Sequence, residues 1–142
     1  MSDSLITFDT NILIYSIDID AGEKHQIAVA LLESTFSQPC FLTVQVLSEF
    51  FSVAIRKKGI SLDDAMAQIE DWQKLFPVVS ATKYSLTKAI YAVKNHHLAF
   101  WDAMLWAVAA EHHASILFSE DFQTGRELEG VRFTNPFLQK VL

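Results

Sequence analysis

Glycine, proline and cysteine are scarce in this sequence. Its 142 residues include four glycines, three prolines and one cysteine, whereas about half of all residues are hydrophobic. No stretch has the composition of a flexible linker, a repeat or a disordered tail. We therefore expect the whole chain, residues 1–142, to fold as a single domain with a substantial core.

The single cysteine, Cys40, excludes an internal disulfide framework and a cysteine-rich zinc site. Such a cysteine suits the reducing cytosol. Free cysteine usually behaves as a small hydrophobic side chain, so we expect Cys40 to be buried.

Long hydrophobic runs are absent as well. The longest, Ala103 to Ala110, is far shorter than the roughly 20 residues that span a bilayer. The polar start, Met1 to Ser4, lacks the basic and apolar regions of a signal peptide. These features predict a soluble cytoplasmic protein that does not contact a membrane.

Basic side chains are in the minority, since 17 acidic and 11 basic residues give a formal charge of −6. A protein that coats nucleic acid in general is normally basic, so the charge argues against that function. The basic cluster Arg56-Lys57-Lys58 precedes Gly59 and is typical of a helix C-terminus, although it is also available to an RNA backbone.

Predicted strands alternate with predicted helices along the chain. The apolar patterns predict strands at 5–8, 40–42, 77–79, 115–118 and 131–133, the last at a sheet edge, and helices at 12–15, 23–35, 44–58, 61–75, 82–96 and 101–112. This alternation predicts an α/β fold with a mainly parallel sheet covered on both faces. Ligands of such sheets bind beyond the carboxyl ends of the strands.

Four acidic side chains stand out by position. Asp9 and Asp121 follow predicted strands, where an aspartate commonly caps a helix or forms a turn. Glu49 lies in a helix that is apolar on most sides, so we expect it to be shielded from water or paired with a lysine. Asp102 lies in the first turn of a helix, which favours a carboxylate, and its helical neighbours are mostly apolar. Each acid alone has an ordinary structural explanation.

The four acids are more informative together, because the predicted topology could bring them to one sheet edge. Two carboxylates about 5 Å apart repel by roughly 3 kcal/mol at an effective dielectric near 20. A cluster therefore requires shared protons or bound cations. Mg²⁺ and Mn²⁺ prefer oxygen ligands, and they activate water and stabilise the leaving oxygen of an in-line displacement at phosphorus. Asn11 and Ser119 could orient a water or a carboxylate nearby.

Several segments resemble one protein family in order and spacing. They are FDTNILIY with Asp9, VQVLSEFF with Glu49, FWDAMLWAVA with Asp102, ILFSEDFQTGRELEGVRFTNPF with Asp121, and the closing Asn135-Pro136-Phe137. Over essentially the entire chain, the sequence is similar to PIN-domain ribonucleases, most closely to VapC-like toxins of type II toxin-antitoxin pairs.

This resemblance implies a three-layer α/β/α PIN fold and an endoribonuclease that depends on Mg²⁺ or Mn²⁺. It implies an acidic site of Asp9, Glu49, Asp102 and Asp121, a homodimer, an RNA substrate and a cognate antitoxin that covers the acidic pocket. The family often has threonine where this chain has Ser119. Glu120 leaves open which neighbour of Asp121 contacts the metal.

Other interpretations are disfavoured but testable. A phosphatase with an aspartyl nucleophile would need a second acid two positions after Asp9, where Asn11 stands. The paired histidines His96-His97 and His112-His113 suggest zinc, but adjacent helical side chains point about 100° apart.

A PIN domain that binds RNA or protein without cutting is the non-enzymatic alternative, and the presence of all four acids argues against it. Trp72, Trp101, Trp106 and Phe50-Phe51 are candidates for base stacking, but aromatic residues at helical spacing are more typical of core or dimer contacts.

Overall fold

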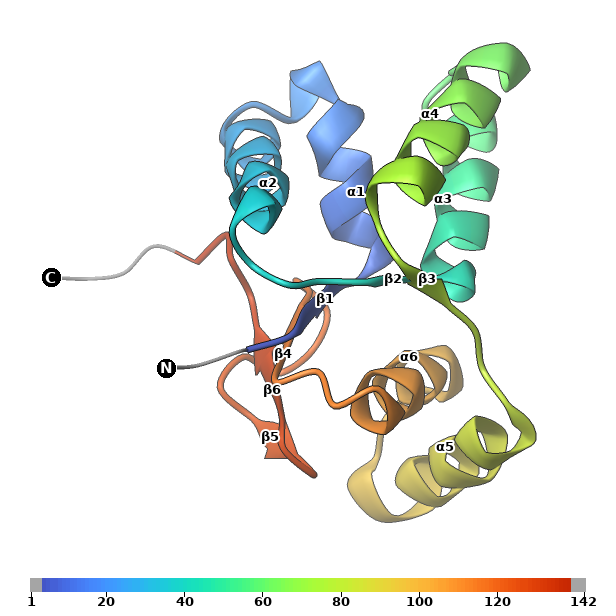
Figure 1. Cartoon of the computed structure of the whole chain (residues 1–142), viewed down its shortest axis with the longest axis vertical. Coiled ribbons are helices and arrows are strands. Elements are labelled where there is room, and N and C mark those ends of the chain that lie inside the picture. The colour runs from blue at the N-terminus through green and yellow to red at the C-terminus, as the bar shows by residue number, and fades with distance from the viewer. Residues whose placement is uncertain (1–3, 139–142) are drawn as a thin grey trace, which may run out of the picture.

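The computed structural model describes residues 4–138 and has helices on both sides of a small sheet (Figure 1). The helices are α1 (Thr10–Ile17), α2 (Glu23–Glu33), α3 (Val44–Arg56), α4 (Leu62–Leu75), α5 (Lys83–His96) and α6 (Phe100–Glu111), with 3-10 turns η1 (Ile19–Ala21) and η2 (Ser34–Phe36). The strands are β1 (Ile6–Phe8), β2 (Leu42–Thr43), β3 (Val78–Val79), β4 (Ile116–Phe118), β5 (Glu127–Leu128) and β6 (Val131–Thr134). The predicted α/β/α architecture is confirmed.

The central sheet has the strand order β1-β4-β6-β5, in which β1, β4 and β6 are parallel. A second parallel pair, β2 and β3, is joined to β1 by a bridge between Ile6 and Cys40. The sheet is therefore mainly parallel, as predicted.

Residues 131–133 form a strand as predicted, but the prediction that this strand lies at the sheet edge is wrong. The short strand β5 pairs antiparallel with β6 and takes the outer position. Glu129 and Gly130 form the turn between them with positive φ angles of 48° and 86°. Because β5 has only two residues, one of them charged, it carries no apolar pattern that would reveal a strand.

Side-chain caps set the starts of the two helices that follow β2. Thr43 Oγ1 accepts from the Val46 amide at the start of α3, at 3.1 Å. Ser61 Oγ accepts from the Asp64 amide at the start of α4, also at 3.1 Å. Each cap satisfies an amide that has no partner within the helix.

The basic cluster at the end of α3 is largely engaged within the protein. Lys58 pairs with Asp18 at 2.9 Å, and Arg56 Nε donates to Ser52 Oγ at 2.9 Å. These contacts favour the helix-end interpretation of the cluster.

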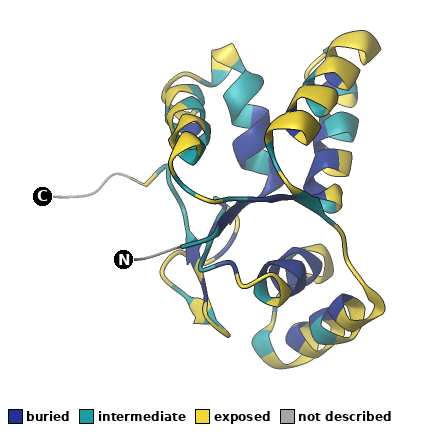
Figure 2. Cartoon of the chain, in the orientation of Figure 1, coloured by how far each residue is buried: buried dark blue, intermediate teal, exposed yellow. Residues whose placement is uncertain are grey.

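The core lies between the sheet and its helices (Figure 2). Helix α6 is buried from Ala103 to Ala109 because α5 covers its outer side. Trp106 is 1% exposed, and its indole Nε1 donates to the Leu128 carbonyl at 3.2 Å. Burying the Trp106 indole while its N–H remains hydrogen-bonded stabilises the packing of α6 against the β5 end of the sheet. Within residues 4–138, no helix is long and apolar enough to cross a membrane.

Candidate active site

Asp9 lies where β1 ends and α1 begins. Its amide donates to the Phe118 carbonyl at 2.8 Å, which joins the ends of β1 and β4. Its Oδ1 accepts from the Thr10 amide at 2.7 Å and caps α1. The side chain is buried, which is uncommon for an aspartate and requires that its oxygens be hydrogen-bonded.

Ser119 follows β4 and connects Asp9 to the rest of the site. Its Oγ donates to Asp9 Oδ2 at 2.7 Å and accepts from the Asp121 amide at 3.0 Å. Asn11 Nδ2 donates to Asp121 Oδ2 at 3.1 Å and lies 3.4 Å from Ser119 Oγ. These four residues therefore form one hydrogen-bonded group beyond the carboxyl ends of two parallel strands.

Asp102, in the first turn of α6, is half-buried. Burial raises its pKa, and the negative charges of Asp121 and Glu49 raise it further. Asp102 is thus close enough to both acids to interact with them electrostatically.

Glu49 is exposed, so the expectation that it is shielded from water is wrong. It lies beside the buried face of α3 rather than within it. That face consists of Val46, Leu47, Phe50 and Ala54. Glu49 nevertheless raises the pKa of Asp102, so it lies within electrostatic reach of the acidic set.

Burial is also the main reason that the pKa of Asp9 rises from 3.8 to about 6. Hydrogen bonds from Ser119 and Thr10 oppose this increase, and the charges of Asp121 and Asp102 add to it. The carboxylates of Asp9, Asp102, Asp121 and Glu49 therefore form one electrostatically connected set. Holding all four ionised together is costly unless a cation compensates.

The donor set fits a hard cation such as Mg²⁺ or Mn²⁺. It consists of carboxylate oxygens, and two further buried oxygens next to Asp9, Thr10 Oγ1 and Asn11 Oδ1, have no hydrogen-bond partner among the described residues. As placed, no three His, Cys, Asp or Glu side chains between residues 4 and 138 are close enough together to hold a metal ion. The fit is therefore one of donor chemistry rather than of geometry.

Glu120 is directed away from this acidic set. Its Oε1 accepts from the Tyr15 hydroxyl at 2.6 Å, and its Oε2 pairs with Lys24 at 2.9 Å. Lys24 Nζ also lies 5.0 Å from the centre of the Tyr15 ring. Both Glu120 oxygens are therefore engaged, whereas Asp121 is bonded to Asn11 within the candidate site.

Gln45 was not among the residues predicted from the sequence. Its Nε2 donates to Glu49 Oε1 at 3.1 Å and to the Trp101 carbonyl at 3.0 Å, so a single amide connects α3 with the start of α6. The spacing of four residues between Gln45 and Glu49, which places both on one side of a helix, is the sequence feature that could have indicated this pair.

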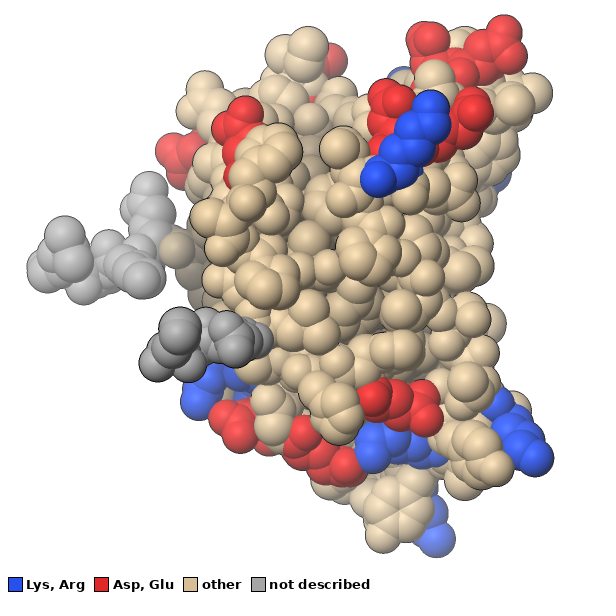
Figure 3. All heavy atoms as spheres, viewed as in Figure 1, with Lys and Arg blue, Asp and Glu red and all other residues tan. Residues whose placement is uncertain are grey.

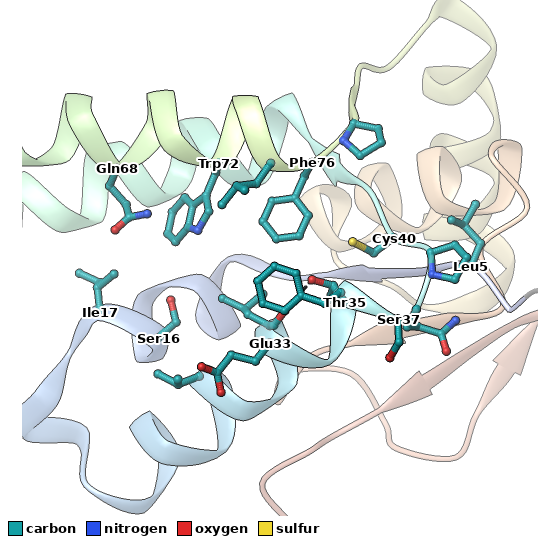
Figure 4. A pocket seen from close by; sticks show the side chains of 17 residues that line it. Leu5, Ser16, Ile17, Glu33, Thr35, Ser37, Cys40, Gln68, Trp72 and Phe76 are labelled. Carbon is teal, nitrogen blue, oxygen red and sulfur yellow. Dashed lines mark hydrogen bonds between the residues drawn. The ribbon is translucent and has the colours of Figure 1, made fainter.

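Two apolar clefts lie outside the acidic site. The larger, of about 830 Å³, opens between α4 and the segment from α1 to η2 (Figure 4). Among the described residues that line it, Glu33 is the one charged residue, and Phe36 is 85% exposed. Cys40 is half-buried and lines this cleft, so the expectation of a buried cysteine is wrong.

The smaller cleft, of about 480 Å³, lies between α3 and α4 and includes Phe51 and Met66. On the face seen in Figure 3, charged side chains gather toward the upper and lower ends, and the middle is uncharged.

The sequence matches the PIN domain family over residues 6–126. The chain therefore belongs to the PIN domain family, which confirms that part of the resemblance. A search of curated proteins found no significant match.

Several solved structures resemble the fold of this chain. A toxin-antitoxin complex from Klebsiella pneumoniae is 21% identical, with a TM-score of 0.68, over 93% of this chain and 98% of that one. VapC20 of Mycobacterium tuberculosis, described as a sarcin-ricin loop cleaving toxin, is 22% identical, with a TM-score of 0.66, over 82% of this chain and 91% of that one. FitAcB from Neisseria gonorrhoeae is 18% identical, with a TM-score of 0.66, over 93% and 98%.

Proposed function

We propose that this protein is an endoribonuclease that hydrolyses RNA phosphodiester bonds with Mg²⁺ or Mn²⁺. The observation that carries the proposal is the buried Asp9 carboxylate, joined through Ser119 to Asp121 and Asn11 beyond the strand ends. Asp102 and Glu49 complete the acidic set from two other helices. A structural cap needs one carboxylate, so a cap alone does not account for four interacting acids.

The residues have distinct roles in this proposal. The carboxylates of Asp9, Glu49, Asp102 and Asp121 would hold the cation and orient a water against the scissile phosphate. Ser119 and Asn11 would fix the orientation of the carboxylates that they contact. When bound, the cation supplies activation of water and neutralisation of the charge that develops on the phosphate.

We further infer that the protein is the toxin of a toxin-antitoxin pair. In support, the solved structures with the same fold include a toxin-antitoxin complex that spans almost the whole of this chain. The large cleft with exposed Phe36 offers an apolar surface for an antitoxin segment. The same proposal includes a homodimer and activity in the cytoplasm, where the protein would encounter its RNA substrate and its antitoxin.

The alternative is a PIN domain that binds RNA or protein without cutting. The exposure of Glu49 favours this alternative. So does the placement of the acids, because no three of them within residues 4–138 are close enough together to hold a metal ion. The burial of Asp9 argues against it. Burying a carboxylate costs free energy of folding, and a role in cation binding would explain why the protein bears that cost.

Cleavage of a transcript pool with Mg²⁺ or Mn²⁺ tests the function. We expect cleavage in wild type, none with EDTA, and a loss of about 100-fold or more in Asp9→Asn and Asp102→Asn. Asp71→Asn, at an exposed acid of α4, is the matched control and should cleave as wild type does. Cleavage that persists in folded Asp9→Asn and Asp102→Asn would show that the site is elsewhere.

A further inference from the structure

Trp101 is exposed, and it immediately precedes Asp102 of the acidic set in the chain. It is 63% exposed, whereas Trp72 is 5% exposed and Trp106 is 1% exposed. Asp102 follows it in the chain, on the first turn of α6. Aromatic residues were expected in core or dimer contacts, and Trp72 and Trp106 lie in the core whereas Trp101 does not. An indole so exposed favours contact with a ligand or a partner.

Two contacts fix the position of Trp101. The Phe100 ring packs edge-on against it, with ring centres 4.9 Å apart and planes inclined by 70°. The Trp101 carbonyl accepts from Gln45 Nε2, and the same amide holds Glu49. The backbone that carries the indole is therefore connected to one of the proposed metal-binding acids. Little freedom would be lost when a flat ligand stacks on the ring.

We propose that the Trp101 indole stacks on an unpaired base next to the scissile phosphate of the RNA, and this inference rests on the proposed function. A nucleobase is neutral and flat, so it can stack on an indole next to acids that would repel an acidic protein surface. Bases inside a duplex are already stacked on each other, so only a single-stranded segment or a loop presents a free face.

A second copy of the chain fits this surface less well. In a two-fold symmetric contact, the same patch lies on both sides of the interface. A contact centred on Trp101 would bring Asp102 and Glu49 of each copy toward the same acids of the other, and each copy carries a net charge of −6. The exposed indole is therefore assigned to the substrate rather than to a dimer interface.

Tryptophan fluorescence can report on a ligand bound at Trp101, because Trp101 is the exposed one of the three tryptophans and Trp72 and Trp106 are buried. In EDTA, single-stranded oligoadenylate should quench the emission in a saturable manner, and the matching duplex should not. Anisotropy of a labelled oligoadenylate should show binding about 5- to 100-fold weaker for Trp101→Leu and within about threefold of wild type for Trp101→Phe. Tyr91→Leu, at an aromatic residue of α5 that is 66% exposed, is the matched control and should bind normally.

Cleavage kinetics with Mg²⁺ separate this inference from the proposed function. We expect Trp101→Leu to raise KM by the same factor as it weakens binding and to change kcat by less than about threefold. Wild type that cleaves RNA, together with Trp101→Leu that binds and cleaves equally well, would overturn the role of Trp101 alone. A halved mass of Trp101→Leu in light scattering with unchanged RNA affinity would overturn it in favour of a dimer contact. Wild type that cleaves no RNA with either metal would overturn the proposed function.

Discussion

Ser119 donates a hydrogen bond of 2.7 Å to Asp9, a residue 110 positions away in the sequence. The contact forms because parallel strands β1 and β4 are neighbours and end at the same edge of the sheet. Ser119 is fully buried, so its hydroxyl is a fixed part of the surroundings of Asp9 rather than a surface group. Consequently, the electrostatics of the candidate site depend directly on the register of two strands.

Replacing Ser119 with alanine should destabilise the protein by about 1–3 kcal/mol, because a buried carboxylate loses a donor and the Asp121 amide loses an acceptor. Urea denaturation at pH 7.5 in EDTA measures this change. Ser48→Ala removes an exposed helical hydroxyl that bonds only to a local carbonyl, and its effect should stay within about 0.5 kcal/mol. A neutral Ser119→Ala would mean that Asp9 does not need this bond.

Asp9 should make the metal-free protein less stable as pH rises. Its pKa is about 6 in the folded state against an ordinary value of 3.8, so folding favours the protonated form. The cost of ionising it is absent below about pH 3.8 and develops fully above about pH 6, amounting to about 3 kcal/mol. The free energy of unfolding in EDTA, measured from pH 4 to 7.5, should fall in wild type relative to Asp9→Asn.

The subtraction of Asp9→Asn is necessary because other acids act in the opposite direction. Lys58 lowers the pKa of Asp18, so that ion pair weakens as pH falls. Parallel pH profiles for wild type and Asp9→Asn would show that burial does not perturb Asp9.

Local patterns in the sequence were sufficient to predict much of the fold. Asp9 caps a helix as predicted, since a cap depends on residues within one turn. Strand β5 was missed because two residues give no periodic pattern. Glu49 was misjudged because helical spacing shows which residues are neighbours on the helix but not where the packed face ends.

The candidate site was predictable as a set of residues but not as a set of contacts. The strand ends and the resemblance named the acids, as well as Asn11 and Ser119. The bond from Gln45 to the Trp101 carbonyl spans 56 positions and depends on how two helices are placed, which a single sequence does not contain. The separate engagement of Glu120 by Lys24 and Tyr15 likewise requires tertiary structure.

Divalent cations should raise the melting temperature of wild type by relieving repulsion among the acids. The increase at pH 7.5 with saturating Mg²⁺ or Mn²⁺ should be larger for wild type than for the double variant Asp9→Asn, Asp102→Asn, because a ligand that binds only the folded state stabilises it more when it binds more tightly. The Asp71→Asn control should respond as wild type does. Equal increases in all three proteins would argue against a cation shared by these acids.

Gln45 should act as a positioning residue for Glu49. Gln45→Ala removes the donor that holds Glu49 Oε1 and frees the start of α6, so we expect Mn²⁺ affinity to fall by about tenfold, as is common for groups that orient metal ligands. Titration calorimetry measures the affinity, and thermal denaturation checks that the fold is intact. Gln26→Ala, at an exposed glutamine of α2, should bind Mn²⁺ as wild type does. Normal Mn²⁺ binding by Gln45→Ala would mean either that Glu49 does not hold the cation or that the position of Glu49 does not depend on this amide. Glu49→Gln distinguishes these two explanations, because it lowers the Mn²⁺ affinity only if the Glu49 carboxylate is a ligand.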